Sequence, residues 1–319
     1  MIFIQAVPKD DYFIWQIAVQ ATNFRKFGVS KQMEVVVWYP DWFKEWDKWR
    51  KLEKAFPEVK FFYYQDEGVN LALYIPQLRP HSLKKHFKEH EERLKGEVFF
   101  YHDSDIIFNT IPDFERLSRG AICWQSNCSG YLDYSYIVRK EEEGKIPNHE
   151  ALNLFAELGG ITPETIEFYD KNSGGAQTIL KNIDSQFWQD VEDITMKIRS
   201  SFFFDVEGSI NRRYFTNESA GYQSWAADMW GLNFALWKRE IPTQVTDDLD
   251  FSWATDDLET YERKPIFHNA GALPKSGLFY KGAWISQWPL GNPVLKLPPE
   301  NTASREYVKA IKETINILS

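Results

Sequence analysis

Short apolar runs alternate with stretches of helical periodicity in the first half of the chain, and this alternation limits the possible folds more than any other feature. Each run is brief and continuous, which is typical of strands covered on both faces of a sheet. The predicted strands cover residues 2–7, 34–39, 59–64, 98–101 and 121–124. Because strand, helix and strand follow one another, right-handed crossovers and a mostly parallel sheet are expected. The predicted fold class is α/β, and ligands of such sheets bind beyond the carboxyl ends of the strands.

Helices are predicted between these strands. The first covers residues 12–27 and ends at Gly28, a typical C-terminal stop. The third covers residues 82–95. The helix between the second and third strands is marked by an apolar stripe made of Trp42, Trp46, Trp49, Leu52 and Phe56. We interpret this stripe as the buried face of the helix and not as a binding site for an aromatic ligand.

The second half of the chain is less regular. Helices are predicted over residues 150–158, 185–203 and 222–238. The tail, residues 304–319, carries apolar residues on one face and is predicted to be a docking amphipathic helix. A charged stretch over residues 139–145 is predicted to be a surface loop or the boundary of an insertion. No repeat, low-complexity tract or clear linker is visible, so one elaborated domain is expected.

Composition excludes several classes of protein. The chain is 43% hydrophobic and 26% charged, which excludes wholesale disorder. A net charge of −9 argues against a nucleic-acid-binding surface. The two cysteines, Cys123 and Cys128, are too few for a disulfide framework, which favours a reducing compartment. No apolar run approaches the roughly 18 residues of a membrane span, and no signal peptide is visible, so a cytoplasmic protein is expected.

The segment 98–108 carries the clearest chemical signal. An apolar strand leads into Asp103-Ser104-Asp105, and the chain then becomes apolar again. In extended backbone, carboxylates two residues apart lie on the same face. Paired carboxylates are hard oxygen ligands that suit Mg²⁺ or Mn²⁺, which also bind substrate phosphates. An acidic protein that binds an anionic substrate needs such a bridging cation, because its own field repels the substrate. The other reading is two aspartates that cap a turn.

Asp103-Ser104-Asp105, after an apolar strand about 100 residues into the chain, resembles the DxD motif of nucleotide-sugar glycosyltransferases with the GT-A fold. The resemblance implies a mostly parallel, Rossmann-like sheet flanked by helices, with an elaborated C-terminal half. It also implies that the two carboxylates hold Mn²⁺ or Mg²⁺ against the donor diphosphate.

Three further segments resemble glycosyltransferase motifs in the same order. Residues 78–83, Leu-Arg-Pro-His-Ser-Leu, are similar to the Arg-Pro segment of plant peptidyl hydroxyproline arabinosyltransferases and serine galactosyltransferases, which implies that Arg79 contacts phosphate. Residues 224–231 resemble a Trp-containing acidic-Met motif of that group. Residues 267–271, with Lys275, resemble the His-x-x-Gly…Lys element of the glycogenin family, although Ser-Gly follows the lysine here where that family has Pro-Trp. The resemblance implies that His268 is a third metal ligand and that Lys275 contacts the diphosphate.

The segment 172–177, Asn-Ser-Gly-Gly-Ala-Gln, is predicted to be a loop. Its glycines allow a ligand to approach the backbone closely. It resembles the Asn-x-Gly segment that lines the donor sugar in GT-A enzymes, and the alternative is an ordinary turn that enters a helix. The resemblance implies donor contacts from Asn172, Gly174 and Gly175 and catalytic roles for Gln177 and Asp228. A rival source of a catalytic carboxylate is the acidic stretch made of Asp247, Asp248, Asp250, Asp256 and Asp257, although a solvated loop is the simpler interpretation.

The resemblance therefore predicts a metal-dependent glycosyltransferase that moves a sugar from a nucleotide-diphosphate sugar, expected to be a UDP-sugar, to a carbohydrate, protein or other hydroxyl acceptor. Retention of the anomeric configuration is expected. The catalytic domain would cover residues 1–300, with a nucleotide-binding half at 1–135 and a sugar or acceptor half at 136–300, and the docking helix would cover 301–319. Two alternatives are an aspartyl-nucleophile phosphatase, which carries Asp-x-Asp on its first strand, and a non-enzymatic carbohydrate-binding protein that uses the many aromatic side chains.

Overall fold

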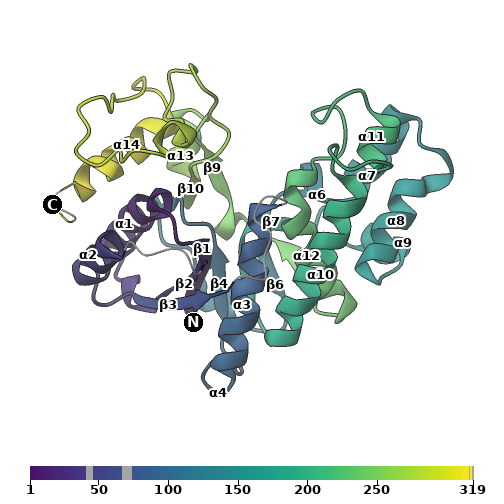
Figure 1. Cartoon of the computed structure of the whole chain (residues 1–319), viewed down its shortest axis with the longest axis horizontal. Helices are drawn as coiled ribbons and strands as arrows, with labels where there is room; N and C mark the ends of the chain where they lie inside the picture. The colour runs from purple at the N-terminus through teal and green to yellow at the C-terminus, as the bar shows by residue number, and fades with distance from the viewer. Residues whose placement is uncertain (41–45, 67–73, 316, 318–319) are drawn as a thin grey trace. The chain divides into compact units, whose positions relative to one another are not determined.

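The chain has an α/β fold, seen in a computed structural model that describes residues 1–40, 46–66, 74–315 and 317 (Figure 1). Its central sheet has seven strands in the order β3-β2-β1-β4-β7-β6-β8, and a second sheet has the order β5-β10-β9. The strands of the central sheet are β1 (Ile2–Pro8), β2 (Met33–Tyr39), β3 (Lys60–Gln65), β4 (Phe99–His102), β6 (Cys123–Asn127), β7 (Gly174–Leu180) and β8 (Thr243–Val245). The pairs β1–β2, β2–β3 and β6–β8 are parallel, whereas β6–β7 is antiparallel. The predicted α/β class with a mostly parallel sheet is confirmed.

Two compact units make up the chain. The first consists of Met1–Glu67, Tyr101–Arg116 and Asp247–Ser319, and the second consists of Gly68–Phe100 and Leu117–Thr246. Each unit therefore combines segments that are far apart in the sequence. The predicted division into halves at residue 135 concerns ligand binding and stays a prediction.

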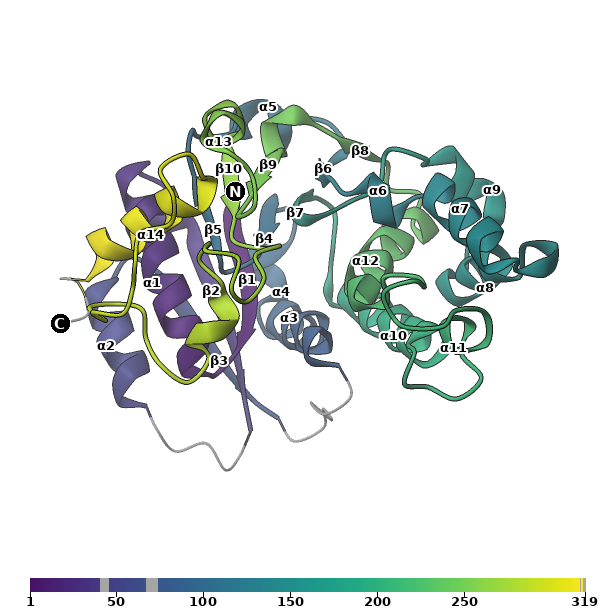
Figure 2. The same cartoon turned by 90° about the horizontal axis from the view of Figure 1, so that it is seen from above.

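The first unit is built around β1, β2 and β3. Its helices are α1 (Asp11–Lys26), α2 (Asp47–Ala55), α5 (Phe114–Ser118), α13 (Leu258–Arg263) and α14 (Ala303–Thr314), and its second sheet contains β5 (Ile106–Phe108), β9 (Phe251–Trp253) and β10 (Ile266–His268). Helix α1 starts where the Asp10 side chain accepts a hydrogen bond from the Tyr12 N–H, which is a normal N-cap. Helix α14 packs beside α1, through buried Tyr307, Val308 and Ile311 (Figure 2). The tail thus has its apolar face on the N-terminal helix.

The second unit is mainly helical. Its longer helices are α3 (Leu78–Glu89), α7 (Tyr134–Gly144), α8 (Glu150–Gly159), α10 (Ser185–Phe202) and α12 (Ala227–Lys238), and its shorter helices are α4 (Glu91–Leu94), α6 (Ser129–Leu132), α9 (Pro163–Phe168) and α11 (Ile210–Tyr214). Helix α10 packs against both α3 and α12. Gly231 allows α12 to approach α10 closely, since a Cβ there would lie 2.4 Å from Thr195 Oγ1. Among the described residues, no helix is both long enough and apolar enough to cross a membrane.

Two predictions about local structure are wrong, and one lies outside the structure. The charged stretch 139–145 is the C-terminal part of helix α7 and not a loop. Asp133 caps this helix. Glu141, in the predicted loop, is a buried residue of the helix and accepts a hydrogen bond from the Leu152 N–H, so this acidic side chain contributes to packing and does not face solvent. The segment 172–177 enters strand β7 at Gly174. Of the predicted tryptophan stripe, Trp49, Leu52 and Phe56 are buried, whereas Trp42 lies outside the described residues.

Candidate metal centre

Asp103 and Asp105 lie in the turn that joins β4 to β5. Strand β5 pairs with β10 in antiparallel register, and this register places His268 opposite Ile106. The next residue, Asn269, donates its backbone N–H to the Asp105 carbonyl oxygen at 3.0 Å. The pairing of the two strands therefore places the histidine beside the carboxylates, although they are distant in the sequence.

The three predicted ligands form a compact group, which we call the triad: Asp103, Asp105 and His268. One ligand atom from each lies within 4.8 Å of the others. His268 Nε2 is 3.4 Å from Asp103 Oδ2 and 3.4 Å from Asp105 Oδ1. Asp105 is 3% exposed and His268 is 5% exposed, whereas Asp103 is less deeply buried. One face of the group is therefore accessible through Asp103.

Lys281, which no motif singled out, contacts the triad. Its Nζ donates a hydrogen bond to Asp105 Oδ2 at 2.5 Å. Burial alone would raise the pKa of Asp105, but the ammonium of Lys281 and then the ring of His268 hold this pKa well below its usual range. The pKa of Lys281 is raised, because attraction to Asp105 outweighs the opposing effect of burial. Asp105 is therefore ionised at neutral pH.

Glutamines of α1 hold the turn in place. Gln20 Nε2 donates to the Asp103 carbonyl oxygen at 2.9 Å, and Gln5 Nε2 donates to Gln20 Oε1 at 2.7 Å. Ser104 Oγ donates to Gln16 Oε1 at 2.9 Å. Gln16 and Gln20 are four residues apart on the buried side of the helix. Amides on an otherwise apolar helix face were the sequence signal for this support, because buried polar groups need partners.

Aromatic neighbours orient the histidine ring. The Trp253 ring stacks on His268 with centroids 5.8 Å apart and an interplanar angle of 19°, and Phe251 packs at 5.4 Å. Both aromatic residues belong to β9, which pairs with β10 in parallel. His268 Nδ1 is buried and has no hydrogen-bond partner among the described side chains and backbone. The ring therefore offers Nε2 to the carboxylates.

The residues present fit a divalent cation. Two carboxylates and one imidazole nitrogen form a mixed O,O,N donor set, which suits a divalent transition-metal ion such as Mn²⁺, whereas Mg²⁺ would be held mainly by the carboxylates. Lys281 cancels one of the two negative charges, so a net negative charge remains when the imidazole is neutral. A divalent cation would more than compensate this remaining charge, and the surplus positive charge would suit an anionic ligand at the same site.

Arg79 and Asp228 belong to the second unit, whereas the triad belongs to the first. Arg79 Nη1 lies 3.0 Å from Asp228 Oδ2, and Tyr74 Oη donates to Asp228 Oδ1 at 2.9 Å. Burial, followed by the Asp228 charge, raises the pKa of Tyr74 well above its usual range. The structure thus joins two predicted residues in one ion pair, and their proposed contacts with a donor stay predictions.

The glycines of β7 approach protein atoms closely. A Cβ on Gly174 would lie 2.2 Å from Gln125 Cβ, and one on Gly175 would lie 2.8 Å from Met229 Sδ. Gln125 Oε1 accepts the Gly174 N–H at 2.9 Å, and Asn233 Nδ2 donates to the Gly174 carbonyl oxygen at 2.9 Å. Packing within the second unit is a sufficient reason for glycine at these positions, without a ligand.

Asn172 and Gln177, the other two predicted residues of the segment 172–177, differ in their hydrogen bonds. Asn172 contributes its carbonyl oxygen, which accepts a hydrogen bond from Thr243 Oγ1 at 3.0 Å. Gln177 is fully buried, and neither polar atom of its side chain has a partner among the described residues. An unpaired buried amide is costly, so Gln177 keeps its place among the candidate functional residues.

Lys275 is exposed, with a φ of 65°, and it lines a pocket of the first unit. The lysine that contacts the triad is Lys281. A diphosphate contact from Lys275 stays a prediction. The rival acidic residues, Asp248 and Asp250, are engaged in ion pairs with Arg116 and Lys264.

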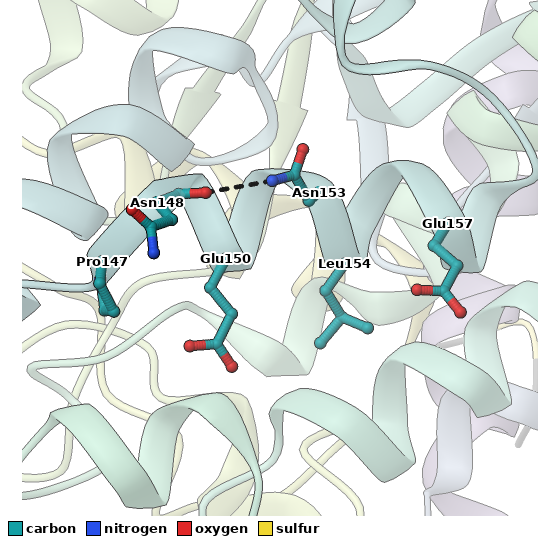
Figure 3. A pocket seen from close by; sticks show the side chains of 6 residues that line it. All are labelled: Pro147, Asn148, Glu150, Asn153, Leu154 and Glu157. Atoms are coloured by element: carbon teal, nitrogen blue, oxygen red, sulfur yellow. Dashed lines mark hydrogen bonds between the residues drawn. The ribbon is translucent and has the colours of Figure 1, made fainter.

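A separate pocket of about 480 Å³ lies on the second unit, along helix α8. Figure 3 shows Glu150 and Glu157 on its wall, with Asn153 bonded to the Asn148 carbonyl oxygen. Glu150 is paired with Arg213 and Tyr214. Among the described residues, no group of potential metal ligands is found on this surface.

Comparison with known proteins yields a distant likeness. No protein-family model matches the chain, and no curated protein sequence matches it. The structure is similar to that of the bifunctional glycosyltransferase WbbM, solved in its apo form, with 10% sequence identity and a TM-score of 0.44. The match covers 85% of this chain and 46% of that chain, so the present chain spans less than half of that protein.

Proposed function

We propose that the chain is a metal-dependent glycosyltransferase of the GT-A type. It would move a sugar from a nucleotide-diphosphate sugar to a hydroxyl acceptor, and the donor we propose is a UDP-sugar. The observation that carries the proposal is the triad, in which Asp103, Asp105 and His268 present ligand atoms within 4.8 Å of one another. Retention of configuration and a cytoplasmic location are part of the proposal and rest on the sequence.

The triad would hold Mn²⁺ or Mg²⁺, which supplies positive charge to the leaving diphosphate. Asp103, the more accessible carboxylate, lies toward the open side of the group. For the diphosphate itself we favour Lys281 over Lys275, because the Lys281 ammonium already lies at the triad. Once a cation shares the charge of Asp105, this ammonium becomes available to another anion.

The resemblance assigns the sugar and acceptor contacts to residues that belong to the second unit. Asp228 is 8% exposed and lies beside Arg79, and its carboxyl oxygens can accept a hydrogen bond from a hydroxyl group. Gln177 offers an unpaired amide. These roles, and those of Asn172, Gly174 and Gly175, come from the resemblance described above.

A panel of nucleotide sugars tests the proposal. The protein is incubated with each donor, with and without Mn²⁺, and free nucleoside diphosphate is measured. Release is expected with a UDP-sugar only when the metal is present, and it should be absent in Asp105→Asn. Release of inorganic phosphate from phosphomonoesters would instead identify a phosphatase. Sugar binding without turnover of any donor would identify a carbohydrate-binding protein.

A further inference from the structure

A second pocket, of about 660 Å³, lies in the C-terminal part of the first unit, and none of the triad residues lines it. Its walls come from residues 274–284 and 294–298. The floor is apolar, because Phe279, Trp284 and Leu295 are buried members of one hydrophobic cluster. The rings of Phe279 and Trp284 stack at 6.0 Å with an interplanar angle of 15°. A concave space of this size with apolar walls is typical of a small-molecule site.

The rim of this pocket is also apolar. Val294 is 69% exposed and Leu297 is 40% exposed, and both line the opening. Leu273 and Ile285, from the same part of the chain, are exposed as well. Exposed apolar side chains are normal when scattered, but a group around a pocket marks a binding surface. The walls therefore favour a ligand with an apolar body.

The positive charge of residues 269–299 indicates which polar group the ligand would carry. Residues 269–299 contain three lysines and no aspartate or glutamate, in a chain of net charge −9. Two of these lysines, Lys275 and Lys296, line the pocket. Neither forms an ion pair with any side chain that the structure describes. Two uncompensated ammonium groups beside an apolar floor complement an anionic headgroup on an apolar chain.

We propose that this pocket binds a single anionic amphiphile, whose apolar chain lies over Phe279 and Trp284 and whose phosphate or carboxylate lies between Lys275 and Lys296. The pocket is a concave depression that could receive one chain, whereas a membrane surface would favour a flat or convex apolar face. This site is independent of the triad and does not require the proposed glycosyl transfer. The triad and the pocket are neighbours along the chain, because the short helix Lys281–Trp284 carries both Lys281, which contacts Asp105, and Trp284, which lines the pocket.

Binding of dodecyl phosphate below its micellar concentration tests the proposal, measured by isothermal titration calorimetry on the full chain without metal. Dodecanol and inorganic phosphate each carry half of the chemistry, so both should bind at least about tenfold more weakly. The double variant Lys275→Gln/Lys296→Gln should lose roughly tenfold in affinity. Its matched control is Lys31→Gln/Lys51→Gln, which removes two exposed lysines of the same unit and should leave binding unchanged. Ala283→Trp, at an exposed lining position, should block the pocket without disturbing the core.

Three results would overturn the proposal. Equal affinity for dodecanol would show that the lysines select nothing. Unchanged affinity in both the lysine variant and Ala283→Trp would place the ligand elsewhere. Binding to phosphatidylglycerol vesicles, but not to monomeric dodecyl phosphate, would show that this face meets a lipid surface. Since none of these measurements involves a nucleotide sugar or Mn²⁺, their outcome is separable from that of the proposed function.

Discussion

The ammonium group of Lys281 lies 2.5 Å from a carboxylate oxygen of Asp105, although 176 residues separate them in the chain. Asp105 is almost fully buried, whereas a third of the Lys281 side chain is exposed. In the absence of a metal ion, this lysine is the main counter-charge of a buried carboxylate. A metal ion held by the triad would therefore contact the same carboxylate, that of Asp105, as Lys281 does.

Lys281→Met keeps the length of the side chain and removes its charge. Without metal, we expect the variant to lose about 2 kcal/mol of unfolding free energy, which lies between the values for an exposed and a fully buried pair because Lys281 is partly exposed. Mn²⁺ should restore more stability in the variant than in the wild type, since it meets an uncompensated Asp105. Urea unfolding with and without Mn²⁺ measures both effects. Lys275→Met is the control, and equal losses in the two variants would contradict the pairing.

His102 predicts a pH dependence of stability. The residue is buried at the end of β4, and burial lowers its pKa to about 4, although a hydrogen bond from its ring to the Asp103 carbonyl oxygen opposes this shift more weakly. In the unfolded chain a histidine titrates near about 6.5, so the unfolded state gains its proton first as the pH falls. Stability contributed by neutral His102 is therefore full above about pH 6.5 and lost by about pH 4, a change of at most about 3 kcal/mol. Unfolding free energies in EDTA should fall less steeply over this window in His102→Asn, and an identical slope would contradict the assignment.

Gly174→Ala separates packing from ligand binding on β7. The added Cβ would lie 2.2 Å from Gln125 Cβ and 2.5 Å from the Ser126 carbonyl oxygen, so we expect a loss of about 1–3 kcal/mol without any ligand. Gly130→Ala is the control, because a Cβ there has no neighbour within 4 Å. Thermal unfolding of the free protein measures the difference. A stable Gly174→Ala variant with impaired donor binding would instead support a role in lining the sugar site.

The two carboxylates of the triad have a local signal, since a buried strand that runs into Asp103-Ser104-Asp105 can be recognised within about ten residues. His268 was expected as a third ligand only through the resemblance of residues 267–271 to the glycogenin element. The antiparallel pairing of β5 with β10 in the second sheet brings the histidine to the carboxylates, and no pattern in the sequence predicted that pairing.

Other parts of the site have no local signal. Lys281 lies in a short helix of a segment without periodicity, and only the tertiary fold places its ammonium at Asp105. Gln16 and Gln20 were visible as amides on a buried helix face, but their partners in the turn were not. The prediction of a loop over residues 139–145 is wrong because solvated loops and amphipathic helices have similar composition. In α7 the decisive feature is a buried charge, Glu141, whose partners come from a later segment.

A nucleotide should stabilise the protein only together with the metal. A ligand that binds the native state alone raises the unfolding free energy, by about 2.7 kcal/mol at a concentration of one hundred times its Kd. We therefore expect UDP with Mn²⁺ to raise the Tm clearly and UDP with EDTA to raise it little. Differential scanning fluorimetry gives both values, with GDP and Mn²⁺ as the specificity control. Equal shifts for GDP would redirect the choice of donor, and a shift without metal would argue against a bridging cation.

Mn²⁺ binding, measured by electron paramagnetic resonance of the free ion, is the most direct test of the metal site, because it needs neither donor nor acceptor. We predict one Mn²⁺ bound per chain in the wild type, and loss of binding in Asp105→Asn while the far-UV circular dichroism spectrum is unchanged. Asp247→Asn, which alters the rival acidic stretch at an exposed position, should bind as the wild type does. Wild-type binding by Asp105→Asn, or loss of binding in Asp247→Asn alone, would contradict the assignment of the metal to Asp103, Asp105 and His268.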